Sequence, residues 1–327
     1  MRTLSARGIR AVWEPGCGHL PELEIDGAPV LWSAPWRDDA AIQSDPAIPV
    51  VERRLGGTFV CLPFGHDDFG GGAIHGAAAN GPWRIARAGT SALTATCATP
   101  YGRVAAGIAV RDDHPVLYQT HILDLAAPAT FAHHPVLHCA EGGRLSAPPP
   151  RAVLTFDAEA PVFARNARAG GWEIDGRDLR DLPRETCEDF ATIVANPGLA
   201  WTALARHAEG DTILSLRRAE QLPVTNVWMS NGARAHAPWH RQRGLVGIED
   251  AICAGAEGFA AARDGTSRVA AEGVPTCLPP GRHVIRHALL RLDGCHEVTD
   301  LRPDGDTLAI GLRSGTRRVP FDGGHFA

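Results

Sequence analysis

The sequence predicts a large all-β protein, an antiparallel β-sandwich with few helices, and three observations support this fold class. The 327 residues include 36 Gly and 25 Pro, counts that suit many turns and short strands better than long helices. Several short runs alternate apolar and polar residues as a half-buried strand does, most clearly at residues 212–216. Turn residues separate nearly all of these runs. A long chain of this kind favours stacked antiparallel sheets.

The strand-like runs extend through the whole chain. We expect strands at residues 22–32, 58–62, 92–98, 104–110, 115–125, 152–156, 190–195, 212–216, 226–229, 245–248 and 307–312. Residues 33–50, which are acidic and contain proline, and residues 65–81, which are rich in Gly and His, are typical of long loops. Residues 251–263 are rich in Ala, but Gly255 and Gly258 interrupt them, so we expect a loop there with one helical turn.

A run of three prolines, Pro148 to Pro150, is the best candidate for a domain boundary. Strand-like segments continue on both sides of it at a similar spacing, so we interpret it as a connection at the edge of a sheet. No internal repeat is present. We therefore expect one domain that covers residues 1–327.

Composition restricts the partners and the location. The net charge is -5 with neutral His, and no basic block occurs, so we expect no nucleic acid partner. No apolar stretch is long enough to cross a membrane, and the N-terminus has no apolar run for secretion. We expect a cytoplasmic monomer or homodimer. The eight cysteines form no Cys-x-x-Cys pair, which argues against a thiolate zinc site and favours free thiols.

Two groups of histidines are candidates for chemistry. His66 and His75 lie in the Gly-rich loop, where glycines allow the backbone to approach a ligand closely. An ordinary surface loop with solvated histidines is an equally good interpretation. His133 and His134 are adjacent in an extended segment, so they face opposite sides and only one of them can point into a given pocket. For any single histidine, a structural role is the more common one.

A third candidate is a carboxylate at the end of an apolar strand. Residues 245–248 run directly into Glu249 and Asp250. A glutamate at the end of a buried strand is unfavourable unless it is paired or functional. The alternative is an acid that reaches solvent. We expect the two carboxylates to face apart.

The order and the contexts of these motifs resemble those of the aldose 1-epimerase, or galactose mutarotase-like, family over nearly the whole chain. The resemblance rests on Gly18 to Gly27 with Val30-Leu31-Trp32, Gly56-Gly57, Pro63-Phe64-Gly65, His75-Gly76 with Trp83, Ala132 to Pro135, Val227 to Asn231, Gly247 to Asp250, and Leu278 to Gly281. The family's Asn-Arg pair before the substrate histidine is missing, as is the arginine that sugar-phosphate mutarotases carry just after His-Gly. The family's aspartate that holds sugar hydroxyls has only Asp189 as a weak counterpart.

This resemblance implies an all-β supersandwich and an isomerase that interconverts the α and β anomers of a small-molecule carbohydrate, without metal or cofactor. It places the general acid on His134 and the general base on Glu249, as a charged pair. It also implies that Trp228 and His75 line the sugar face. Asn231 and His66 are weaker candidates for contacts with hydroxyls.

Three other functions remain open at this point. The chain could be a carbohydrate-binding protein of the same fold without turnover, or a related isomerase or lyase that acts on a modified sugar. A metal-dependent cupin barrel would use His133, His134, His138 and Glu141. That alternative is the weakest, because a cupin needs His-x-His spacing to bring two rings to one strand face.

Overall fold

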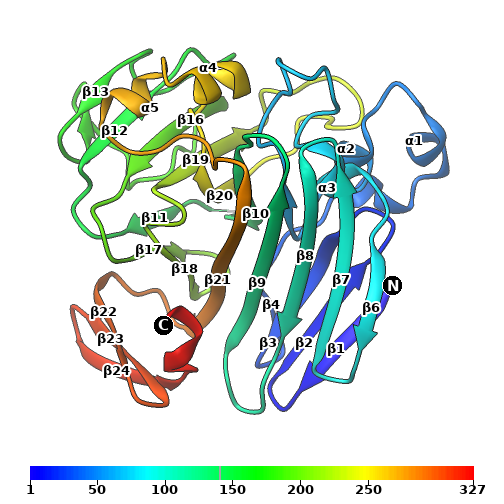
Figure 1. Ribbon diagram of the computed structural model, residues 1–327. Coiled ribbons are helices and arrows are strands. Elements are labelled where there is room, and N and C mark those ends of the chain that lie inside the picture. The colour runs from blue at the N-terminus through cyan, green and yellow to red at the C-terminus, as the bar shows by residue number, and fades with distance from the viewer. Residues whose placement is uncertain (140) are drawn as a thin grey trace.

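The computed structural model describes residues 1–139 and 141–327, and antiparallel strands dominate them (Figure 1). Every segment predicted as a strand overlaps an observed strand, so the predicted all-β class is confirmed. The helices are short. They are η1 (Pro35–Asp38), α1 (Ala40–Ser44), α2 (Val50–Arg53), α3 (Gly76–Asn80), α4 (Gly258–Asp264), α5 (Arg268–Ala271) and η2 (Gly323–Phe326).

The first layer is an eleven-stranded sheet with the order β1-β2-β3-β5-β10-β20-β19-β16-β12-β13, in which β4 also pairs with β3. Its strands are β1 (Arg2–Ala6), β2 (Ile9–Glu14), β3 (His19–Ile25), β4 (Ala28–Pro29), β5 (Thr58–Cys61), β10 (Phe131–His138), β12 (Ala152–Thr155), β13 (Arg168–Ala169), β16 (Cys187–Val194), β19 (Val224–Asn231) and β20 (Leu245–Ile252). The central strands come from distant parts of the chain, so the sheet brings remote residues side by side.

The second layer is an eight-stranded sheet with the order β11-β17-β18-β21-β9-β8-β7-β6. Its strands are β6 (Arg84–Ala88), β7 (Ala92–Thr99), β8 (Gly102–Ala109), β9 (Val116–Leu125), β11 (Gly143–Ser146), β17 (Leu199–Arg206), β18 (Asp211–Arg218) and β21 (Gly281–Asp293). Two small sheets complete the fold, one of β14 (Glu173–Ile174) and β15 (Arg177–Asp178), the other of β22 (Val298–Asp304), β23 (Thr307–Leu312) and β24 (Gly315–Pro320).

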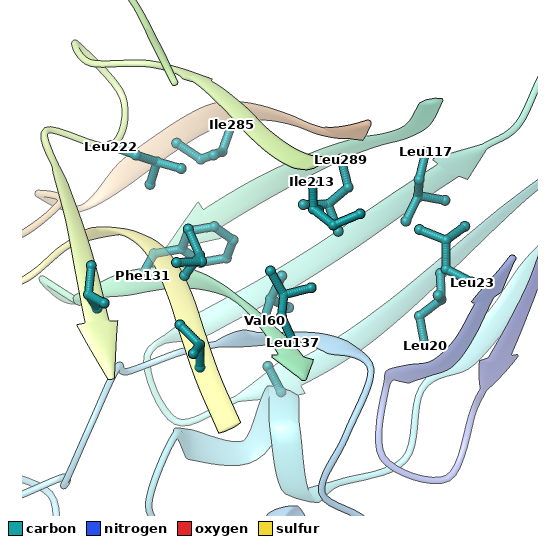
Figure 2. Close-up of a cluster of buried hydrophobic side chains, with 14 of the residues drawn as sticks. Leu20, Leu23, Val60, Leu117, Phe131, Leu137, Ile213, Leu222, Ile285 and Leu289 are labelled. Atoms are coloured by element: carbon teal, nitrogen blue, oxygen red, sulfur yellow. The ribbon is translucent and has the colours of Figure 1, made fainter. Parts of the chain in front are cut away.

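The main hydrophobic core fills the space between the two large sheets. Figure 2 shows side chains from both layers in contact there. The first sheet and its neighbours contribute Leu20, Leu23, Val60, Phe131 and Leu137, and the second contributes Leu117, Ile213, Ile285 and Leu289. A separate cluster packs β22–β24 against the other face of the second sheet, near the C-terminus in Figure 1.

The central strands of the first sheet are buried on both faces. Each residue of β19 and of β20 is buried, whereas β7 shows the alternation of a half-exposed strand. A second hydrophobic cluster explains the difference, because it covers the outer face of these strands. It joins Phe59 and Trp228 of the sheet to Trp36 and Trp239 of the connecting segments. The outer face of the central strands is therefore a second interior, in which a site can form.

Three loop predictions need correction. Residues 33–50 contain η1 and α1, where Asp39 accepts hydrogen bonds from Ala41 N and Ile42 N as an N-cap. Residues 65–81 end in α3. After β20 the chain forms α4, which spans seven residues, more than the expected single turn. Its first residue, Gly258, has a φ of 89°, so the glycine begins this helix rather than breaking it.

All eight cysteines lie in the described part of the chain, and all are free thiols. Among residues 1–139 and 141–327, no helix is long and apolar enough to cross a membrane.

Candidate active site

A pocket of about 280 Å³ opens on the outer face of the central strands. Its walls are mostly aromatic and aliphatic, from Leu55, Phe64, Ile74, Phe190, Trp228 and Trp239. Its polar side chains are few and include His134 and Glu249. An apolar cleft with a few convergent polar groups is the usual form of a small-molecule site.

His134 and Glu249 meet in this pocket. The ring Nε2 of His134 on β10 lies 3.2 Å from Oε1 of Glu249 on β20. Both residues are almost fully buried, with 4% and 2% of their surface exposed. The antiparallel register sets His133 opposite Asp250, which brings the preceding carboxylate and the following imidazole together on the other face. The predicted encounter of these two distant residues is therefore present in the structure.

The ring of His134 is held by a stack of aromatic rings. Phe59 lies against it with ring centroids 4.6 Å apart, and His19 lies against Phe59 at 4.5 Å. His75 meets the His134 ring edge-on at 5.1 Å. Among the described residues, neither Nδ1 of His134 nor Oε2 of Glu249 has a hydrogen-bond partner. The pair is thus fixed in position but keeps free polar atoms.

Burial sets the charge of the pair. It raises the pKa of Glu249 to about 8, although a hydrogen bond from Asn226 acts in the opposite direction. It lowers the pKa of His134 well below the usual value, and the nearby His75 lowers it further. Both shifts favour an uncharged pair in which Glu249 holds the proton at neutral pH. The charged pair expected from the sequence is not the form that this environment stabilises.

The structure brings three of the four other predicted residues to the pocket. His66, His75 and Trp228 all line it. His75 has a φ of 62° immediately before α3, and its Nδ1 lies 3.3 Å from Sγ of Cys61. Burial lowers the pKa of His75 to about 3, so this ring is neutral. His66 is exposed at the mouth of the pocket.

Asn231, which was predicted to contact a sugar hydroxyl, lies outside the pocket. It follows Trp228 by three residues on β19, and an odd separation along a strand places a side chain on the opposite face. Its Nδ2 donates to the carbonyl oxygens of Arg184 and Glu185, and its Oδ1 accepts from Gly244 N. The amide is therefore fully used in joining loops.

Asp189, the weak counterpart of the family's aspartate, is also committed elsewhere. Its Oδ2 accepts hydrogen bonds from the backbone N–H groups of Val162 and Phe163, and its Oδ1 accepts from that of Phe190. It does not line the pocket.

Sequence reasoning did not identify Arg234, Trp239 and Glu52, which also line the pocket. The guanidinium of Arg234 lies over the ring of Trp239 at 4.4 Å, and Nε1 of Trp239 donates to Oε1 of Glu52. These residues lie in irregular segments or in the short helix α2, where no periodicity marks a side chain as buried. A tryptophan in an otherwise polar loop was the available signal.

The adjacent histidines face opposite sides, as the strand alternation predicts. His133 lies between the sheets, where its ring stacks on His287 at 4.0 Å, and His134 faces the pocket. They cannot share one ligand, which the cupin alternative requires. Within residues 1–139 and 141–327, no group of three or more His, Cys, Asp or Glu side chains is arranged to hold a metal ion.

A scan against protein-family models finds no match for the sequence, and a search of the curated proteins finds none. Solved structures resemble the chain along most of its length. A provisionally assigned aldose 1-epimerase from Escherichia coli K12 has a TM-score of 0.62 at 14% identity, covering 89% of this chain and 98% of that chain. A galactose mutarotase related enzyme from Lactobacillus acidophilus has a TM-score of 0.57 at 12% identity, with 91% and 99% covered. A galactose mutarotase-like protein from Lactobacillus casei has a TM-score of 0.56 at 13% identity, with 89% and 100% covered. The chain therefore has the galactose mutarotase-like β-sandwich fold that its motifs predicted.

Proposed function

We propose that this protein is an isomerase that exchanges the α and β anomers of an aldose, with His134 and Glu249 as its acid/base pair. The observation that carries the proposal is the 3.2 Å contact between Nε2 of His134 and Oε1 of Glu249 inside an apolar pocket. The names of the structural neighbours point to the same reaction.

Anomer exchange needs two proton transfers, one at the anomeric hydroxyl and one at the ring oxygen. A base removes the proton of the anomeric hydroxyl while an acid protonates the ring oxygen, so the C1–O5 bond breaks and an aldehyde forms. Rotation about the C1–C2 bond presents the other face of the aldehyde. Ring closure then reverses both transfers. The pair must hold one proton in total, and each member acts as acid in one direction and as base in the other.

The uncharged pair meets this requirement. Glu249 holds the single proton, so on ring opening it donates to the ring oxygen while the neutral His134 accepts from the anomeric hydroxyl. The charged form, with His134 as acid and Glu249 as base, contains the same number of protons. Ring opening converts the uncharged pair into the charged form, and ring closure, with His134 as acid and Glu249 as base, restores the uncharged pair.

Two matched variants test the proposal. Glu249→Gln and His134→Asn each remove one proton-transfer group and keep a similar shape, so exchange should slow by about a hundred- to ten-thousandfold. Polarimetry, or NMR exchange between anomer signals, measures the rate on a panel of aldoses. Calorimetry should show that Glu249→Gln still binds the sugar. Wild-type rates in both variants contradict the proposal, and sugar binding by a wild-type protein without exchange selects the binding-protein alternative.

A further inference from the structure

Arg234 is the one arginine among the described residues that line the pocket. It follows β19 by three residues, and its guanidinium lies over two indole rings, 4.4 Å from the centroid of Trp239 and 5.3 Å from that of Trp228. A guanidinium held between two aromatic rings loses little freedom when it binds a ligand. The side chain is 30% exposed, so a molecule in the pocket can reach it.

A buried carboxylate fixes this guanidinium and balances its charge. Nη2 of Arg234 donates to Oε1 of Glu188 at 2.6 Å, and the same oxygen accepts from Nε1 of Trp228, also at 2.6 Å. Glu188 is only 7% exposed. One contact occupies a single donor of the five that an arginine carries, so the other N–H groups remain available to oxygen atoms of a ligand.

The net charge around this part of the pocket is not positive. Glu188 neutralises Arg234, and Glu52 adds a second carboxylate to the lining. His75 adds no positive charge, because burial lowers its pKa to about 3. A phosphate dianion would meet one paired guanidinium and an unfavourable carboxylate. A neutral pair of hydroxyls would meet donors on Arg234 and an acceptor on Glu52, which suits a diol.

We propose that Arg234 is a substrate-binding residue that holds hydroxyl groups of an uncharged aldose, and that its pairing with Glu188 makes the site prefer the free sugar to its phosphate ester. This inference rests on the proposed function and gives its substrate class. It also supplies an arginine for a site in which the sequence lacks the two arginines of the family pattern. Arg234 holds the sugar in place, while the proton transfers remain with His134 and Glu249.

The first test is Arg234→Met, which keeps the length of the side chain but removes its donors. We expect KM for D-galactose or D-glucose to rise about tenfold to a hundredfold, the loss typical of hydrogen bonds to a charged group, with kcat changed much less. Arg243→Met is the matched control. Arg243 lies on the same segment, is exposed, and does not line the pocket, so its KM should stay at the wild-type value.

The second test is Glu188→Gln, which keeps an acceptor for Trp228 but frees the charge of Arg234. Wild-type protein should use glucose with a higher kcat/KM than glucose 6-phosphate. In Glu188→Gln the ratio of kcat/KM for glucose to kcat/KM for glucose 6-phosphate should fall by about tenfold, because the unpaired guanidinium attracts the phosphate. A wild-type preference for glucose 6-phosphate, or an unchanged ratio in Glu188→Gln, overturns the charge argument.

Calorimetry separates this inference from the proposed function, because binding needs no turnover. If wild-type protein binds the sugars of the panel without exchanging anomers, the proposed function fails, and weaker binding by Arg234→Met still supports the role of Arg234. If exchange occurs and Arg234→Met keeps the wild-type KM and Kd, only the inference fails. A wild-type protein that binds no uncharged aldose of the panel contradicts the inference as well.

Discussion

Strands β10 and β20 carry a histidine and a carboxylate on each of their two faces, and the two faces differ in how these groups are satisfied. On the inner face, Asp250 accepts hydrogen bonds from Ser215 and Thr225 and lies 2.8 Å from Nη1 of Arg217. On the outer face, His134 and Glu249 have each other and few other partners. The inner carboxylate is thus paired with a cation and hydrogen-bonded, although neither ring nitrogen of His133 has a hydrogen-bond partner among the described residues. Within the same residues, the outer carboxylate has polar contacts only with His134 and Asn226.

The pKa values of the two carboxylates show the consequence. Burial would raise the pKa of Asp250, but Arg217 and hydrogen bonds from His287 and Ser215 bring it down to about 2. Burial raises the pKa of Glu249 to about 8, because no cation in the described part of the chain offsets it. Adjacent carboxylates on one strand therefore differ in protonation at neutral pH. The inner one is ionised and paired with Arg217, and the outer one holds the proton that the proposed anomer exchange requires.

The largest expected effect on stability comes from the inner face. Asp250→Asn leaves Arg217 buried with an unpaired charge, so the free energy of unfolding should fall by about 3–5 kcal/mol. Urea denaturation measures it. Asp124→Asn is a suitable control because its ion pairs with Arg103 and Arg282 are exposed, and such pairs are worth about 1 kcal/mol or less. A loss in Asp250→Asn no greater than in the control would show that the network is not structurally important.

Removing the carboxylate of the outer face should not reduce the free energy of unfolding. The pKa of the Glu249 carboxyl is higher in the folded chain than in the unfolded chain. The free energy of unfolding therefore falls as the pH rises from the unfolded pKa through about 8. Glu249→Gln should therefore be at least as stable as the wild-type protein at pH 7, while its activity is lost. A clear drop in its melting temperature would indicate that Glu249 has a structural role similar to that of Asp250.

The pH dependence of activity should follow the one proton of the outer pair. Loss of that proton from Glu249 gives a decline of kcat/KM above about pH 8, tenfold per pH unit, and protonation of His134 gives a decline only well below its usual pKa. Anomer exchange measured from pH 5 to 10, with the spontaneous rate subtracted, gives the profile. An upper limb near the ordinary carboxyl pKa would contradict the protonated Glu249.

The sequence predicted this arrangement where strand geometry decides it. Alternation separated His133 from His134. Glu249 and Asp250 were expected to face apart because a turn was predicted at Asp250, but β20 continues to Ile252, so strand alternation separates them. The family resemblance assigned the acid and base roles to the two outer residues. Asn231 was assigned to the pocket on the family resemblance alone. It lies three residues from Trp228 on β19, and an odd separation places the two side chains on opposite faces. Arg234, Trp239 and Glu52 could not be assigned, since the path of an irregular segment depends on contacts formed only in the folded chain. That residues 1–327 form one domain stays a prediction.

A smaller effect should appear in acid on the inner face. Burial lowers the pKa of His133 well below 6.5, so this ring stays neutral in the folded protein and takes a proton only after unfolding. Its contribution is constant above about pH 7, and stability falls by up to about 1.4 kcal/mol per pH unit below 6.5. His133→Phe keeps a flat ring against His287 and removes this loss. Between pH 7.5 and pH 5.5 the melting temperature of the wild-type protein should therefore fall more than that of His133→Phe. An equal fall in both proteins would contradict the prediction.

The smallest effect on activity is expected at Asn231. This residue tests on a third strand, β19, whether alternate side chains face opposite sides of the sheet. Asn231→Ala removes hydrogen bonds to Arg184, Glu185 and Gly244 but nothing in the pocket. We expect kcat/KM for anomer exchange within about twofold of wild type and a loss of about 1–3 kcal/mol in unfolding free energy, because three hydrogen bonds between segments are removed. Trp228→Leu, on the opposite face of the same strand, should instead raise KM. If Asn231→Ala raised KM as much as Trp228→Leu does, β19 would present both residues to the sugar, and the separation of the two faces would not hold along that strand.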